Sequence, residues 1–271
     1  MLLVVIVIVS VTLAGAAGLL ARRWLNTDND AVATAEGLDA GEMWTPVRIL
    51  VALVLAFVLV QTFSSFQDAG DAAVKEASAV SAEATSAGLL PRPAATELVG
   101  TLLCYARAVA GPGWTTLEAT RRSSPITEQA TAAVEAAIGR AETAGANDVV
   151  LSQIYAADHE RVEARRTRLA EAQPSVPGIV TALLIACVAI TIGGTATMAH
   201  RRMRPGLRHL LVGITAVIFT ATLLVILDLD RPFGGIASIK PTDLRNVEQQ
   251  LAANPLGANP PCDASGAPLG A

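Results

Sequence analysis

The fold of this chain is decided by one apolar stretch and the polar segment directly after it. VRILVALVLAFVLVQTF (47–63) is followed by SSFQDAGDAAVKEASAV (64–80), and the only charge in the first stretch is Arg48, at its edge. The hydrocarbon core of a bilayer, about 30 Å thick, needs roughly 20 apolar residues in a helix. The first stretch therefore predicts a membrane-spanning helix, and Trp44 at its mouth suits the membrane interface.

Outward from this stretch, three more apolar runs are long enough to span a bilayer: Met1–Ala21, Val176–Ala199 and Leu210–Leu227. Backbone groups in lipid must bond within their own segment, so all four runs are predicted to be helices. The composition agrees, because 52% of residues are hydrophobic and 16% are charged, against about 25% charged in soluble domains. Arg22 and Arg23 follow the first run instead of preceding it, which favours a retained helix over a cleaved signal peptide.

The polar segment Gln67–Gln173 lies between the second and third spans. Proline and glycine divide it into three expected helical stretches, Phe66–Gly88, Pro93–Ala110 and Ile126–Ala172, the last broken near Gly145. No stretch alternates with period two, so the predicted class is all-α. The predicted parts are 1–66 (two spans), 67–173 (a helical bundle), 174–230 (two spans) and 231–271 (a turn, a short helix and a disordered tail).

Arginine placement predicts the orientation in the membrane. The loops between spans one and two and between spans three and four are rich in arginine, with Arg201, Arg202, Arg204 and Arg208 in the second loop. Short arginine-rich loops stay in the cytoplasm. The expected location is the inner (plasma) membrane of a bacterium, with the N-terminus, the bundle and the tail outside the cytoplasm.

Asp228, Asp230 and Arg231 stand at the end of the fourth span, before Pro232, Phe233 and Gly234. One interpretation is a cluster of charged residues, joined by salt bridges, that orients this turn and contributes to an ion pathway. The other is an interfacial helix end at which Asp230 pairs with Arg231, because charges near a membrane tend to be paired.

Two other charged groups also have two interpretations each. Asp68, Asp71 and Lys75 share a helix face, which is either a charged vestibule or a surface with an Asp71–Lys75 pair. The arginines at 161, 165, 166 and 168 form either a contact with anionic lipid or a solvated face of mixed charge.

Cys104 and Cys262 can form a disulfide if both lie on the oxidising side of the membrane, and stay thiols if they are cytoplasmic. Cys187 is expected to be a small apolar filler. His159 has no convergent partners, and no catalytic, phosphate-binding or metal motif is present. The sequence predicts no enzyme, cofactor or metal site, and the formal charge of −4 argues against nucleic-acid binding.

Four motifs, in order, resemble those of the bestrophin-like membrane proteins, which are considered distant relatives of bestrophin chloride channels. They are Leu55–Phe66 with Lys75-Glu-Ala77, Leu89-Leu-Pro91, Tyr105-Ala-Arg107 with Trp114, and Leu227–Gly235. Ser78 and Gly113 depart from the family pattern, which has an Asn and an acidic residue there. The resemblance runs from the second span to Pro241.

The resemblance implies long helices that continue from the membrane into a polar bundle, and a ring of five subunits around a pore lined by the second span. The implied pore-lining residues are Val54, Phe57, Val60 and Phe63, with Gln61 and Ser64 as hydrogen-bonding groups. The alternative is that the apolar ones pack against helices or membrane lipids. In bestrophins the bundle is cytoplasmic, which opposes the arginine rule.

Two functions follow as hypotheses. The first is a homo-oligomeric ion channel, for anions by the resemblance, or an ion-sensing protein. The second is a non-conducting scaffold or accessory subunit that docks on a larger membrane complex.

Overall fold

A computed structural model describes residues 16, 20, 40–198 and 205–269 of the 271-residue chain. The predicted first span, Met1–Ala21, lies outside the described residues except for positions 16 and 20. The described part is helical, with one isolated bridge between Cys262 and Pro268. Its elements are α2 (Ala40–Ala87), α3 (Arg92–Ala108), the π-helical turn η1 (Val109–Gly113), α4 (Trp114–Thr120), α5 (Pro125–Thr143), α6 (Asp148–Glu171), α7 (Gly178–Met198), α8 (Pro205–Leu229), α9 (Thr242–Ala253) and the 3₁₀ turn η2 (Pro255–Gly257).

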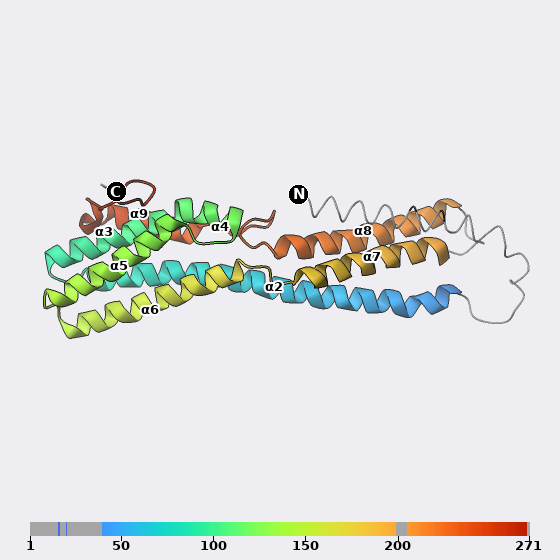
Figure 1. Cartoon of the computed structure of the whole chain (residues 1–271), viewed down its shortest axis with the longest axis horizontal. Coiled ribbons are helices and arrows are strands. Elements are labelled where there is room, and N and C mark those ends of the chain that lie inside the picture. Colours follow the sequence, from blue (N-terminus) through green and yellow to red (C-terminus); the bar gives the residue numbers. More distant parts are fainter. Residues whose placement is uncertain (1–15, 17–19, 21–39, 199–204, 270–271) are drawn as a thin grey trace, which may run out of the picture. The chain divides into compact units, whose positions relative to one another are not determined.

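The chain divides into two compact units. Within the described residues, unit 1 holds α2 up to Ser64 together with α7 and α8, and unit 2 holds the remainder of α2 together with α3 to α6 and the chain after Asp230. α2 is therefore shared between them (Figure 1). Its 48 residues extend about 72 Å at 1.5 Å each, more than twice the thickness of a hydrocarbon core. The membrane-spanning segment is therefore only the apolar first part of α2, in unit 1.

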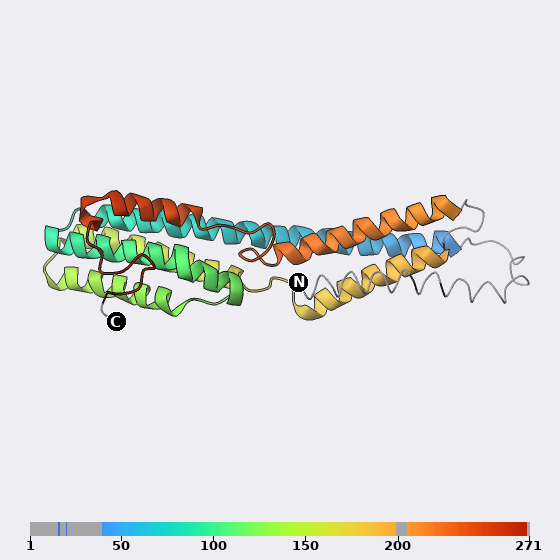
Figure 2. The same cartoon turned by 90° about the horizontal axis from the view of Figure 1, so that it is seen from above.

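Unit 1 is a three-helix group in which α2, α7 and α8 lie side by side in both views (Figures 1 and 2). Each of the three is long and apolar enough to cross a membrane. Their shared core consists of Val51, Leu55, Leu184, Val188, Ile192, Leu223 and Ile226. A Cβ on Gly194 of α7 would overlap the Trp44 ring. Glycine is required there because the Trp44 indole packs directly against the backbone of α7.

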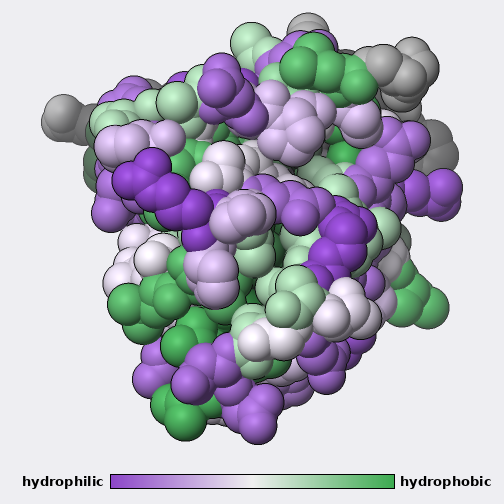
Figure 3. All heavy atoms as spheres, turned by 90° about the vertical axis from the view of Figure 1, so that its left-hand side faces the viewer, coloured by the Kyte–Doolittle hydropathy of each residue, from purple (hydrophilic) through white to green (hydrophobic). Residues whose placement is uncertain are grey.

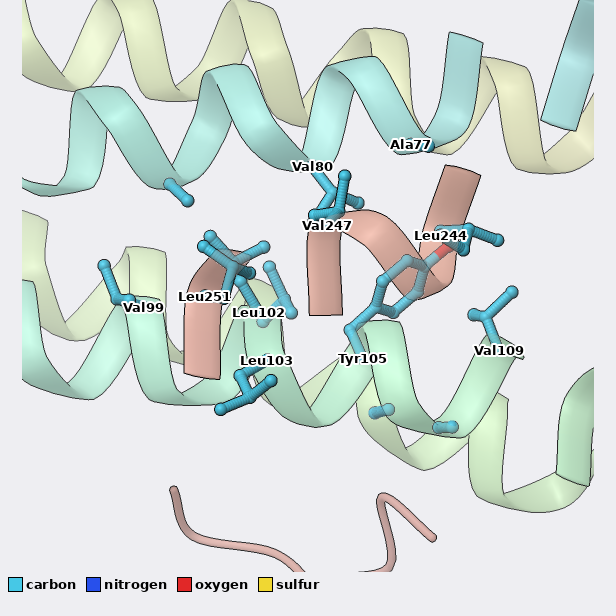
Figure 4. Close-up of a cluster of buried hydrophobic side chains, with 14 of the residues drawn as sticks. Ala77, Val80, Val99, Leu102, Leu103, Tyr105, Val109, Leu244, Val247 and Leu251 are labelled. Atoms are coloured by element: carbon cyan, nitrogen blue, oxygen red, sulfur yellow. The ribbon is translucent and has the colours of Figure 1, made fainter. Parts of the chain in front are cut away.

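Unit 2 is a bundle of the polar helices, closed by α9. Figure 4 shows Leu244, Val247 and Leu251 of α9 placed between Val80 of α2 and Leu102 of α3. All five side chains are buried, so α9 is an integral part of the core. Figure 3 looks onto an end of this unit, where hydrophilic side chains cover much of the surface and hydrophobic ones lie between them. A polar exterior of this kind suits a bundle that stands in water.

Two expectations for unit 2 differ from the structure. The sequence predicts that Gly111-Pro112-Gly113 interrupts the helix, but the chain passes through it as a π-helical turn and continues into α4. The sequence also predicts a disordered tail after Ala253, yet the tail is ordered to Leu269, through η2 and a turn in which the Asp263 carboxylate accepts hydrogen bonds from Ser265 and Ala267. Short capping bonds of this kind order a chain whose composition alone is typical of a linker.

Candidate functional site

The membrane part of α2 has one packed face and one uncovered face. Val51 and Leu55 are buried against α7 and α8, and Thr62 is buried as well. The side chains predicted to line a pore lie on the uncovered face, where Phe57 is 73% exposed and Val60 is 69% exposed. The other four exposed members of the predicted set are Val54, Gln61, Phe63 and Ser64. Within residues 40–198 and 205–269, no segment of the chain covers this face.

The same face continues into unit 2 as an acidic groove. At 100° per residue, Asp68, Asp71 and Lys75 fall on the helical stripe that carries Phe57 and Gln61. They line a cavity of about 560 Å³ together with residues of α6. Five carboxylates line this cavity, against the single amine of Lys75: Asp68, Asp71, Glu160, Glu163 and Glu171. Lys75 and Asp71 share the groove, and no ion pair joins them in the structure.

A neighbouring face of α2, about 100° around the helix from Lys75, carries buried carboxylates that the sequence alone did not reveal. Glu76 is fully buried and bonds the Arg168 guanidinium through both oxygens, at 2.5 Å from Nε and 3.1 Å from Nη2. The Tyr105 hydroxyl donates a third hydrogen bond to Glu76, at 2.5 Å. The Arg168 guanidinium lies over the Trp114 ring, 5.4 Å from its centre. This forked, charge-assisted pairing fixes α6 to α2.

A second buried ion pair lies two helical turns further along α2. Glu83 accepts a hydrogen bond from Arg161 at 3.1 Å, and Asp158 pairs with the same guanidinium. Arg161 also lies over the Tyr105 ring, 4.6 Å from its centre. Burial raises the pKa of Glu83 to about 7, although the charge of Arg161 opposes the rise. Burial also raises the pKa of Tyr105 well above its usual range, which keeps its hydroxyl a donor.

Both interpretations of the α6 arginines were wrong for three of the four residues. Arg161, Arg165 and Arg168 are buried, and Arg165 bonds Glu128 at 2.6 Å. Arg166 alone of the four is exposed. The signal in the sequence was the spacing: two acids seven residues apart on α2, and two arginines seven apart on α6. Seven residues return to nearly the same helix face, so two matching pairs can form between neighbouring helices.

The turn after α8 resolves the alternatives for Asp230 and Arg231. The Asp230 carboxylate accepts hydrogen bonds from the backbone and hydroxyl of Ser175, at 2.8 and 2.9 Å, and from the backbone of Val176, at 3.0 Å. The expected Asp230–Arg231 pair is therefore wrong: the carboxylate caps the turn that precedes α7. Asp228 lies in the last turn of α8.

Beyond Asp230 the chain folds onto α4 within unit 2. Pro232 and Phe233 are buried, and the Phe233 ring meets the Trp114 ring edge to face at 5.2 Å. Gly234 lies so close to Glu118 that a Cβ would sit 3.0 Å from the Glu118 carbonyl oxygen. The predicted turn motif thus becomes part of the wall of a small cavity that Arg231 also lines.

Cys104 of α3 and Cys262 of the tail form a disulfide across 158 positions. Gly266, with φ of +83°, brings the tail against α3, where a Cβ would lie 2.6 Å from the Cys104 carbonyl oxygen. Cys187 of α7 is a free thiol. His159 is exposed, and among the described residues no group of three His, Cys, Asp or Glu side chains could hold a metal ion.

Comparisons with known proteins agree with this architecture. Residues 4–244 match the Bestrophin-like domain family. A crystal structure of a bacterial bestrophin homologue from Klebsiella pneumoniae, carrying a point mutation, superposes with a TM-score of 0.73 at 14% identity, over 94% of this chain and 99% of that one. Another crystal structure of the Klebsiella homologue superposes with a TM-score of 0.72 at 15% identity, over 91% of this chain and 96% of that one. No match was found among curated proteins. The chain belongs to the bestrophin-like family, as its motifs predicted.

Proposed function

We propose that this protein is a homo-oligomeric ion channel in which α2 of each subunit lines the pore. The observation that carries the proposal is the uncovered stripe on α2, apolar at Phe57 and Val60 and acidic at Asp68 and Asp71. A hydrophobic constriction followed by a charged vestibule is a common arrangement in channels, because the constriction gates by dewetting and the charges concentrate ions. The ring of five subunits implied by the resemblance brings five such stripes together.

The sign of the vestibule supports cations over the anions that the resemblance implies. With five carboxylates and one amine, the groove between α2 and α6 has a formal charge of 1 − 5 = −4 per subunit. A negative field raises the local concentration of cations and repels anions, and rings of Asp and Glu are typical of cation-conducting pores.

Reconstitution in a planar bilayer under a tenfold KCl gradient tests both statements. We expect a conductance whose reversal potential approaches the potassium value, about 59 mV in magnitude. Replacing Asp68 and Asp71 by Asn is expected to move the reversal potential toward zero, whereas Glu135→Gln, on the exposed side of α5, leaves it unchanged. A reversal potential at the chloride value refutes the cation proposal. Absence of conductance together with co-purifying membrane subunits supports the scaffold instead.

We also propose that unit 2 and the tail lie outside the cytoplasm. Two independent features support this: the arginine-rich loops at the other ends of the spans, and the Cys104–Cys262 disulfide, because such bonds persist in oxidising compartments. C-terminal fusions provide the test. We expect the alkaline phosphatase fusion to be active and the green fluorescent protein fusion not to fluoresce. The reverse result places unit 2 in the cytoplasm.

A further inference from the structure

A cavity of about 330 Å³ in unit 2 has no part in the proposed pore. It lies between the end of α4 and the turn after α8, and the buried residues Leu117 and Phe233 are among those that line it. Two arginines, Arg121 and Arg231, line it together with Glu118. Two arginines in one pocket are suited to a ligand with an anionic end.

The two arginines are available to such a ligand. Arg161, Arg165 and Arg168 each bond a carboxylate. Neither Arg121 nor Arg231 has a side-chain hydrogen bond or an ion pair within the part of the chain that the structure describes. Arg231 does not pair with the adjacent Asp230, because that carboxylate accepts hydrogen bonds from the backbone N–H groups of Ser175 and Val176. An unpaired guanidinium in a pocket retains all five of its donors.

The backbone holds both arginines in place. Arg121 ends α4 in the left-handed region, with φ of +58°. Its N–H donates to the Leu117 carbonyl at 2.8 Å, and its own carbonyl accepts from the Gln173 side chain at 2.7 Å. The Arg231 carbonyl accepts hydrogen bonds from the N–H groups of Gly234 and Gly235 at 3.0 and 2.9 Å. A pocket whose charged residues have a fixed backbone loses little entropy when it binds.

Charge and chain position identify the ligand class. Two guanidiniums and one carboxylate give 2 − 1 = +1, which matches a phosphodiester monoanion and disfavours a phosphomonoester dianion. Guanidinium forks pair with phosphate oxygens through two parallel hydrogen bonds, and the Glu118 carboxylate can accept from a headgroup hydroxyl. Arg231 follows the last residue of α8, Leu229, by two positions, which places it at the end of a membrane span.

We propose that this pocket binds the phosphodiester of an anionic phospholipid with a hydroxylated headgroup. The shared chemistry is the phosphate, so the experiment has one arm for lipid and one for free phosphate. The full-length protein in detergent is titrated with phosphatidylglycerol, with phosphatidylcholine, whose choline cation the arginines repel, or with inorganic phosphate. Native mass spectrometry measures lipid adducts, and the shift in melting temperature measures phosphate.

We expect phosphatidylglycerol to bind in preference to phosphatidylcholine. Arg121→Gln with Arg231→Gln should weaken that binding at least tenfold. Arg245→Gln, which removes an exposed charge on α9, should leave it unchanged. Glu118→Gln should tighten the binding of phosphatidic acid, a dianion, which a merely structural role of the pocket does not predict.

Each remaining outcome has a definite meaning. A melting shift with inorganic phosphate that depends on both arginines, without lipid adducts, assigns the site to a soluble phosphate and overturns the lipid source. Equal phosphatidylglycerol binding by wild type, the double variant and Arg245→Gln overturns the site altogether. Should the double variant fail to fold, Arg121→Gln alone and Glu118→Gln decide, because both alter partly exposed or exposed side chains. These binding measurements do not depend on whether the protein conducts ions.

Discussion

The buried pair of Glu76 and Arg168 offers a sharp test of how unit 2 is held together. Its charged atoms approach within 2.5 Å, and the side chains are 0% and 3% exposed. Arg168→Met leaves the Glu76 carboxylate buried with only Tyr105 as a hydrogen-bond partner. Removing one member of a buried pair costs about 3–5 kcal/mol, a large part of the roughly 5–15 kcal/mol that stabilises a typical domain. Glu76→Gln should cost a similar amount, because it leaves Arg168 without an anion.

The double variant distinguishes pairing from packing. A glutamine at position 76 is not charged but still offers an acceptor to Tyr105. Glu76→Gln combined with Arg168→Met therefore buries no charge, and it should cost much less than the sum of the single variants. The expected coupling is about 3 kcal/mol or more, of the order of the cost of one unpaired buried charge.

A matched control is available in the same unit. Arg140 and Glu97 approach to 2.6 Å, but their side chains are 56% and 42% exposed. A double-mutant cycle on this pair should give a coupling of only about 0.2–1 kcal/mol, because solvent screens it. Guanidinium-induced unfolding in detergent, followed by circular dichroism, measures all of these variants. Additive costs at Glu76 and Arg168, or equal couplings at the two pairs, would refute the reasoning.

Three further outcomes are expected. Burial gives the Glu83 carboxyl a pKa of about 7 against an ordinary 4.5, so the folded state holds this proton more tightly than the unfolded state does. The free energy of unfolding should therefore fall as the pH rises from about 4.5 to 7. The expected loss is roughly 3 kcal/mol, at about 1.36 kcal/mol per pKa unit. Unfolding curves between pH 5 and 7 should show this fall in wild type and lose it in Glu83→Gln; identical pH slopes contradict the assignment. Removing the disulfide by Cys104→Ser should lower stability by about 3–5 kcal/mol, because it closes a long loop; dithiothreitol should destabilise wild type and leave this variant unaffected, and an unresponsive wild type argues against the bond. Phe57→Ser should raise single-channel conductance by wetting the apolar constriction; an unchanged conductance removes Phe57 from the pore.

The predictions from the sequence were most accurate for features that a short contiguous stretch of residues determines. The second, third and fourth apolar runs predicted three helices able to cross a membrane, since a span depends on the length and composition of one segment. Gly145, with φ of +78°, lies in the predicted break, between α5 and α6, and Pro125 is the first residue of α5, a position that favours proline. After this break the Asn147 side chain caps α6 by accepting a hydrogen bond from the N–H of Val149.

The candidate site was less accessible to such reasoning. That Phe57 and Val60 share a stripe follows from helical period alone, but their exposure depends on which face of α2 meets α7 and α8. The role of Asp230 was misassigned, since its partners, Ser175 and Val176, are more than fifty positions away. The cavity between Arg121 and Arg231 carries no sequence signature, because its two sides come from segments 110 positions apart.

The sequence by itself determined that this protein is helical, that it enters the bilayer, and which family it joins, since hydropathy, helical period and short motifs are properties of contiguous residues. Only the tertiary structure decided which charges are buried. Glu76 meets Arg168 across 92 positions, and Glu83 meets Arg161 across 78. Whether an ionisable side chain faces water or a partner depends on the rotation and register of two packed helices, and that is fixed by the whole core at once.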